Sequence, residues 1–225
     1  MKKLAILVGA IALTGSTFAQ KATAENPYSL EGQIGFNTST LSFAAPAIRF
    51  RYFVKDNIAA RVTLGVNNTS TTTNVFEKES DNSGANGTSV VKANGWNASI
   101  GGEYHFTGTD RLSPYGGLDI VFGGGKASTV NTNSDGTSYV ADFKHTTEAK
   151  TSAMGVNLVA GTDYYFAENF YVGLELGLGF RSTKTKAGID DITTGGNTTH
   201  NDSNEAKTSN VGNNFISNFR LGWRF

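Results

Sequence analysis

Twelve ionisable side chains of this chain stand in segments where polar and apolar residues alternate, most of them between apolar neighbours. They are the arginines Arg49, Arg51, Arg61, Arg181, Arg220 and Arg224, the carboxylates Glu31, Glu103, Asp119, Asp163 and Glu175, and the imidazole of His105. Six guanidinium groups against five carboxylates could form a network of ion pairs or line a charged pore. If the fold buries the face that carries these side chains, they must be paired and hydrogen-bonded, because an isolated buried ion is costly. We predict an interior charge network in which His105 is a member rather than a catalytic base.

Catalytic chemistry finds little support in the sequence. A nucleophile needs a base within reach, and the two other histidines of the mature chain, His145 and His200, stand in separate segments rich in Ser, Thr and Asp. Hydroxyl groups are so common there that the combination does not indicate a catalytic triad. We therefore expect no enzymatic activity and no cofactor.

One polar segment carries oxygen ligands at a spacing similar to that of a calcium-binding loop. It runs from Asn131 through Asp135 and Gly136 to Asp142. Asn131 replaces the usual leading carboxylate, and Asp142 replaces the bidentate glutamate of such loops. We favour a hairpin with Asp135 and Gly136 at its tip, assign no metal ligand, and leave calcium binding by this segment open.

The composition favours an all-β protein with one domain. The 225 residues include 27 Gly, 3 Pro and no Cys. Glycine costs about 1 kcal/mol relative to alanine inside a helix. The absence of cysteine excludes disulfides and thiolate-bound zinc. The formal net charge is zero, and no single-sign field points to nucleic acid as a partner.

The N-terminus predicts secretion. Residues 1–19 contain Lys2 and Lys3, a short apolar run and a small-residue site after Ala19, which is typical of a cleavable signal peptide. The apolar run is too short to span a bilayer as a helix, which needs about 20 residues. We expect residues 20–225 to form the mature domain. No other run is as hydrophobic, which excludes a helical membrane protein.

From Tyr28 onward the dominant pattern has a period of two residues, which indicates β-strands with one apolar face. Apolar residues at the even positions from Phe170 to Phe180 alternate without exception with Tyr171, glycines, Glu175 and Arg181. The pattern recurs in eight segments, at about residues 28–36, 46–53, 58–67, 96–106, 114–124, 154–166, 170–181 and 214–225.

The connections between these segments alternate in length. Residues 54–57, 107–113 and 167–169 are predicted to be short turns. Asn67–Gly95, Lys126–Lys150 and Ser182–Asn213 are predicted to be long polar loops. An even number of strands with short turns at one rim and long loops at the other is typical of an outer-membrane barrel.

Side-chain volume predicts which face of the sheet lies inside. The interior of an eight-stranded barrel is only wide enough for side chains to fill. The polar face carries many glycines, whereas the apolar face carries Phe, Trp, Tyr and Leu, so we expect the apolar face to point outward into lipid. A soluble barrel with apolar residues inside is the alternative.

Aromatic residues gather at the strand ends, among them Phe53, Tyr115 and Tyr171, and we expect them to form two girdles at the membrane interfaces.

These features resemble the small outer-membrane β-barrels of Gram-negative bacteria that include the OmpA transmembrane domain and OmpX, members of the porin family. The likeness is carried by the signal peptide, the eight alternating segments, and a last segment that ends in aromatic residues. It implies that this last segment is the recognition signal for the barrel assembly machinery. The residues concerned are Phe215, Phe219, Leu221, Trp223 and Phe225.

Taken together, the sequence predicts an all-β, eight-stranded, antiparallel, up-and-down transmembrane β-barrel in the outer membrane. We expect a monomer with a closed, salt-bridged interior, in contact with outer-membrane lipid. We expect it to be a structural or surface-interaction protein whose long extracellular loops meet a partner that the sequence does not identify. The alternative is a small porin for ions or small solutes, followed by a lipid A-modifying enzyme.

Overall fold

The computed structural model describes residues 26–37, 42–43, 46–77 and 86–225. The predicted signal peptide, residues 1–19, lies outside the described residues. The strands are β1 (Tyr28–Asn37), β2 (Ser42–Phe43), β3 (Ala47–Lys55), β4 (Ile58–Phe76), β5 (Asn86–His105), β6 (Leu112–Ser134), β7 (Tyr139–Ala167), β8 (Phe170–Thr194), β9 (Asn197–Asp202) and β10 (Ala206–Arg224). Within the described residues there is no helix long and apolar enough to cross a membrane.

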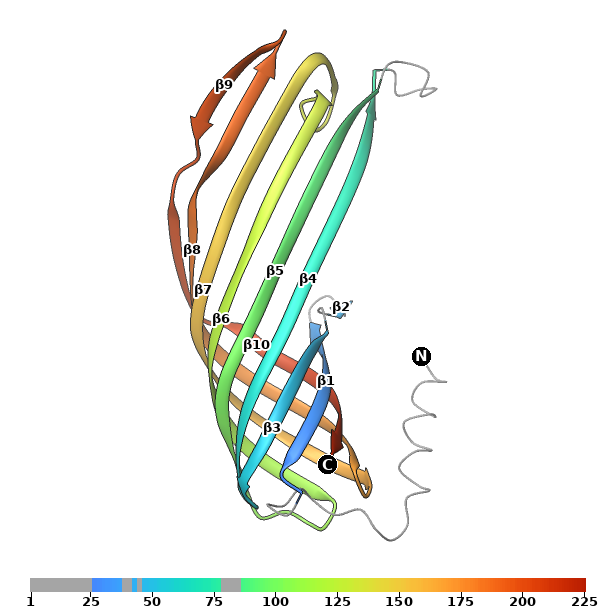
Figure 1. Ribbon diagram of the computed structural model, residues 1–225, viewed down its shortest axis with the longest axis vertical. Helices are drawn as coiled ribbons and strands as arrows, with labels where there is room; N and C mark the ends of the chain where they lie inside the picture. Colours follow the sequence, from blue (N-terminus) through green and yellow to red (C-terminus); the bar gives the residue numbers. More distant parts are fainter. Residues whose placement is uncertain (1–25, 38–41, 44–45, 78–85) are drawn as a thin grey trace.

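Eight of these strands close into a ring (Figure 1). Neighbours from β3 to β8 pair antiparallel in chain order, β1 pairs with both β3 and β10, and β10 pairs with β8 to complete the circuit. The short strands β2 and β9 pair with β1 and β8 and lie outside this circuit. The prediction of an eight-stranded antiparallel barrel is confirmed.

The two faces of the ring are sorted as the side-chain volumes predicted. Large apolar side chains on the outer face are exposed, for example Leu64 at 60%, Leu158 at 66% and Leu221 at 58% of their surface. Most buried side chains of the ring are polar or charged and lie on the inner face. Apolar outside and polar inside is the arrangement that suits a lipid environment rather than water.

The segments predicted to be long loops are instead mostly β-strand. β4 stays paired with β5 up to Phe76, and β6 with β7 up to Ser134. In Figure 1 the upper parts of β4 to β9 rise as a tall curved wall above the ring, whereas β1 and β3 end far lower. We call this wall the extension. The loop prediction is therefore wrong for most of Asn67–Gly95, Lys126–Lys150 and Ser182–Asn213.

The hydrophobic pattern of the sequence did not predict the strands of the extension, because they are polar on both faces. Residues 69–73 of β4 are threonines and one serine, and they are all exposed. Threonine is well suited to strands, but a run of threonines gives no contrast between apolar and polar positions. A hydrophobic period of two residues depends on such contrast and is lost where both faces of a strand are polar.

The tip of the β6–β7 hairpin is built around Asp135. Its carboxylate accepts hydrogen bonds from the backbone amides of Ser138 at 2.7 Å and Thr137 at 2.8 Å. These two amides lower the pKa of Asp135 below its usual range. The hairpin interpretation of this segment is confirmed. The β8–β9 turn uses Gly195 and Gly196 with φ of 57° and 83°, a region that glycine adopts without strain.

Candidate functional site: the buried interior network

Each of the eight ring strands contributes at least one buried ionisable side chain to the interior. Because alternate residues of a strand face the same side, the register of the ring brings these groups together. Those with 5% or less of their surface exposed are Glu31, Arg49, Arg51, Arg61, Glu103, His105, Asp119, Asp163, Glu175, Arg220 and Arg224. Five arginines therefore stand against five carboxylates in this set.

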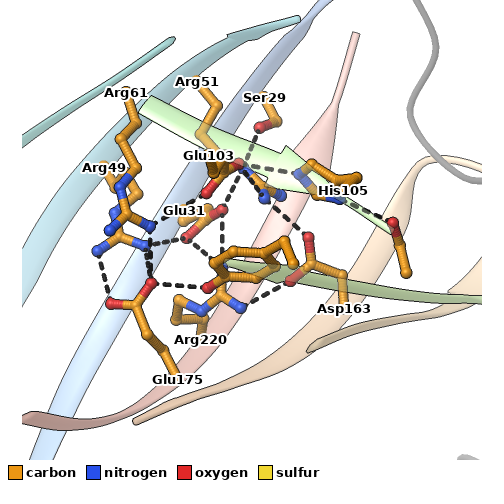
Figure 2. Close-up of polar contacts among 12 residues, drawn as sticks. Ser29, Glu31, Arg49, Arg51, Arg61, Glu103, His105, Asp163, Glu175 and Arg220 are labelled. Carbon is orange, nitrogen blue, oxygen red and sulfur yellow. Dashed lines mark hydrogen bonds and ion pairs between the residues drawn. The ribbon is translucent and has the colours of Figure 1, made fainter. Parts of the chain in front are cut away.

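Arg51 on β3 joins three strands. Its Nε lies 2.6 Å from the carboxylate of Glu31 on β1. Its Nη1 lies 2.8 Å from both Glu103 on β5 and Asp163 on β7. The guanidinium also lies over the ring of Tyr171, 5.0 Å from its centroid. These partners lie on the far side of the barrel as well as next to β3, so Arg51 crosses the interior (Figure 2).

Arg49 and Arg61 converge on Glu175 of β8. Arg49 donates from Nη1 and Nη2 to the two carboxylate oxygens of Glu175, at 2.8 and 2.9 Å. Arg61 donates to the same carboxylate at 2.8 Å. It also forms a bidentate ion pair with Asp119, in which both hydrogen bonds are 2.7 Å long. The hydroxyl of Tyr115 donates a further bond to Glu175 at 2.6 Å. Paired bonds of this kind are the stronger form of arginine–carboxylate contact.

Arg220 of the last strand connects the remaining carboxylates. It lies 2.7 Å from Asp163 and 3.3 Å from Glu31. The hydroxyl of Tyr171 donates to Glu31 at 2.8 Å. Glu31 and Asp163 thus each contact Arg51 and Arg220, and the ion pairs form one connected network rather than separate couples.

An aromatic layer lies at the turn end of the network. Phe53, Tyr165 and Tyr171 are at most 2% exposed and form a buried cluster with Ala59. The ring of His105 lies 5.2 Å from that of Phe53. The expectation that Phe53, Tyr115 and Tyr171 belong to membrane girdles is wrong, since all three are buried inside. The alternation itself indicated that these residues face inward. Phe53 is two residues from Arg51 and Tyr171 is four residues from Glu175, and even spacings along a strand place side chains on the same face.

Glycines on the inner face make room for these large groups. A Cβ atom added to Gly161 would collide with the ring of Tyr115, and one added to Gly222 would collide with Tyr171. One added to Gly173 would collide with the guanidinium of Arg220. Small residues therefore stand beside large ones inside, which agrees with the volume argument from the sequence.

His105 lies within the network and contacts two polar partners. Its Nδ1 lies 2.8 Å from the hydroxyl of Ser113, and its Nε2 lies 3.2 Å from Glu103. His145 and His200 lie in the extension, where they contact Asp190 and Asp191 respectively. Among the described residues, no group of three or more histidine and acidic side chains could hold a metal ion.

Arg181 differs from the other predicted members of the network. It has the parity of Glu175 on β8 but stands nearer the extension and is exposed. In the described part of the chain, no carboxylate lies within ion-pair distance of it. A Cβ added to Gly123 would come within 3.3 Å of its Nη2, which places its head group beside β6. The prediction that Arg181 belongs to the buried network is therefore wrong. The alternation gave the correct face of β8 but not the height of Arg181 along the barrel.

The residues of the implied assembly signal lie in the second half of β10 and, for Phe225, directly after its last residue. Phe219, Leu221, Trp223 and Phe225 are exposed on the outer face, and Trp223 contacts the ring of Phe225 at a centroid distance of 4.8 Å. The side chain of Phe215 lies outside the described residues. These four apolar side chains recur at every second residue and lie on the outer face of the barrel.

Comparison with known proteins gives one family match and one similar solved structure. Residues 37–180 match the model of the family described as "Putative OmpA-OmpF-like porin family". No curated protein matches. Among solved structures, the N-terminal β-barrel domain of Pseudomonas aeruginosa OprF is similar, with 17% identity and a TM-score of 0.39 over 89% of this chain and 98% of that chain.

Proposed function

The chain belongs to the OmpA-OmpF-like porin family and is an outer-membrane β-barrel, and from this premise we propose that its interior is closed to solutes. On this proposal the protein is a monomeric structural or surface-interaction protein. The observation that carries the proposal is the connected network of buried ion pairs, to which all eight ring strands contribute.

The composition of the interior supports closure in two ways. The ion pairs join side chains from opposite sides of the ring, and the aromatic layer of Phe53, Tyr165 and Tyr171 lies beneath them at the turn end. An eight-stranded barrel is narrow enough for such side chains to fill, whereas wide aqueous channels belong to barrels of about 16–18 strands.

The extension supports a role at the cell surface. It stands on the rim opposite the short turns, which is the extracellular rim in barrels of this layout. Binding surfaces are often carried by segments that project from a rigid scaffold.

A small porin is the second candidate, and the family name and the exposed guanidinium of Arg181 at the upper interior favour it.

Conductance across a planar bilayer distinguishes the closed barrel from the small porin. We expect no steady channels from the purified barrel, because ions would have to cross the buried network. A wide porin inserted in parallel controls for membrane quality. Steady channels of appreciable size would contradict a closed interior.

We further propose that the end of β10 is the signal read by the barrel assembly machinery. Deletion of Phe225 is expected to reduce the amount of barrel in the outer membrane, because it removes the exposed aromatic residue that directly follows β10. Immunoblotting of membrane fractions measures this. Removal of the exposed aromatic Phe106 by Phe106→Ala is the control, since it lies on the outer face but outside β10. Normal outer-membrane levels of the deletion variant would contradict the proposal.

A further inference from the structure

Four consecutive strands carry a lysine at the same spacing beyond the apolar band of the outer face. On β5, β6, β7 and β8 the band ends at Trp96, Phe122, Met154 and Phe180, all exposed. Four residues further toward the extension stand Lys92, Lys126, Lys150 and Lys184. The outward positions between them are occupied by Asn94, Gly124, Ser152 and Ser182. We call the four lysines the lysine belt.

The strand register places the belt on one continuous surface. A spacing of four residues keeps each lysine on the outward face. Lys126 is directly opposite Lys150, and Lys184 is opposite Ser152. Lys186, opposite Lys150, and Lys207, opposite Lys184, add two further ammonium groups. The belt therefore follows the outside of the barrel across neighbouring strands.

Positive charge dominates this surface. The carboxylate of Glu148 pairs with Lys126 at 2.6 Å, and that of Glu205 pairs with Lys184 at 2.9 Å. No carboxylate of the described residues lies within ion-pair distance of Lys92 or Lys150. Like charges directly opposite each other destabilise a pair of strands, as at Lys126 and Lys150. An anion bound between them would offset this repulsion.

The height of the belt indicates which anions lie within its reach. Four residues span about 13 Å along a strand, and at the usual tilt of roughly 40° this is about 10 Å above the edge of the apolar band. That is the level of the lipid headgroups, which lysine reaches readily because its long stem is flexible. We propose that the lysine belt binds the phosphate groups of anionic lipids in the outer leaflet.

Lipid retention by the purified full-length barrel tests the proposal. The probes are diphosphoryl and monophosphoryl lipid A, and native mass spectrometry of the detergent-solubilised barrel measures how much of each remains bound. The wild type is expected to retain the diphosphoryl lipid more strongly. In the double variant Lys92→Gln and Lys150→Gln, retention is expected to fall about fivefold per lysine, the equivalent of about 1 kcal/mol for a lysine at an anionic surface.

A matched double variant controls for total charge. Lys55 lies at the turn end, and Lys144 lies on β7 six residues above Lys150, and both are exposed. Lys55→Gln and Lys144→Gln together are expected to leave lipid retention unchanged. Folding of every variant is verified by its heat-dependent mobility in gels. Equal retention of the two lipids by the wild type, or an equal loss in both double variants, would overturn the proposal.

Discussion

Replacement of Glu175 with leucine is expected to lower the free energy of unfolding by about 3–5 kcal/mol, because it leaves buried positive charge without its partner. Glu175 is 1% exposed and accepts bonds from Arg49, Arg61 and Tyr115. Leucine occupies a similar volume but accepts none of these bonds. Urea titration of the barrel folded in lipid vesicles, followed by tryptophan fluorescence, measures the loss.

An exposed ion pair provides the control for this experiment. Glu205 is about half exposed and contacts Lys184 at 2.9 Å. Glu205→Leu is expected to cost less than about 1 kcal/mol, since water solvates the lysine that is left behind. Equal losses from the two substitutions would show that burial of the interior network does not govern its contribution to stability.

A double variant separates the ion pair from the packing of the site. Arg49 makes its two shortest charged contacts with Glu175. Arg49→Met combined with Glu175→Leu is expected to be less destabilised than the sum of the two single variants, because neither charge then remains buried without the other. Strict additivity would argue against an energetic coupling between these two side chains.

Leu176→Arg is expected to cost about 2–4 kcal/mol, because an arginine at the bilayer midplane must leave water for hydrocarbon. Leu176 is the sequence neighbour of Glu175, but it faces outward and is 42% exposed. It lies near the middle of the apolar band on β8, which runs from Phe170 to Phe180. The same unfolding titration in lipid vesicles measures this cost.

Depth in the membrane supplies the control for Leu176. Met154 lies at the upper edge of the apolar band on the neighbouring strand and is 59% exposed. Met154→Arg is expected to cost at most about 1 kcal/mol, since the guanidinium there reaches the interface. If arginine were tolerated at Leu176 as well as at Met154, the outward orientation of this face would be refuted.

The sequence by itself determined the membrane-facing part of this protein. The alternation from Phe170 to Arg181 set both the strand and the faces of its residues, since a strand has a period of two. The contrast between bulky apolar and small polar positions then indicated which face meets lipid. Both inferences depend only on local spacing and volume, and the structure agrees with them.

Only the tertiary structure decided how far the strands extend and which charges meet. Threonine-rich strands such as the upper part of β4 show no contrast between faces, so their pairing depends on neighbouring strands rather than on their own pattern. Arg51 and Asp163 are 112 residues apart in sequence, and Arg181 matches the parity of Glu175 but not its depth. Parity is a local property of the chain, whereas depth and partners are set by how eight strands are staggered in a closed ring.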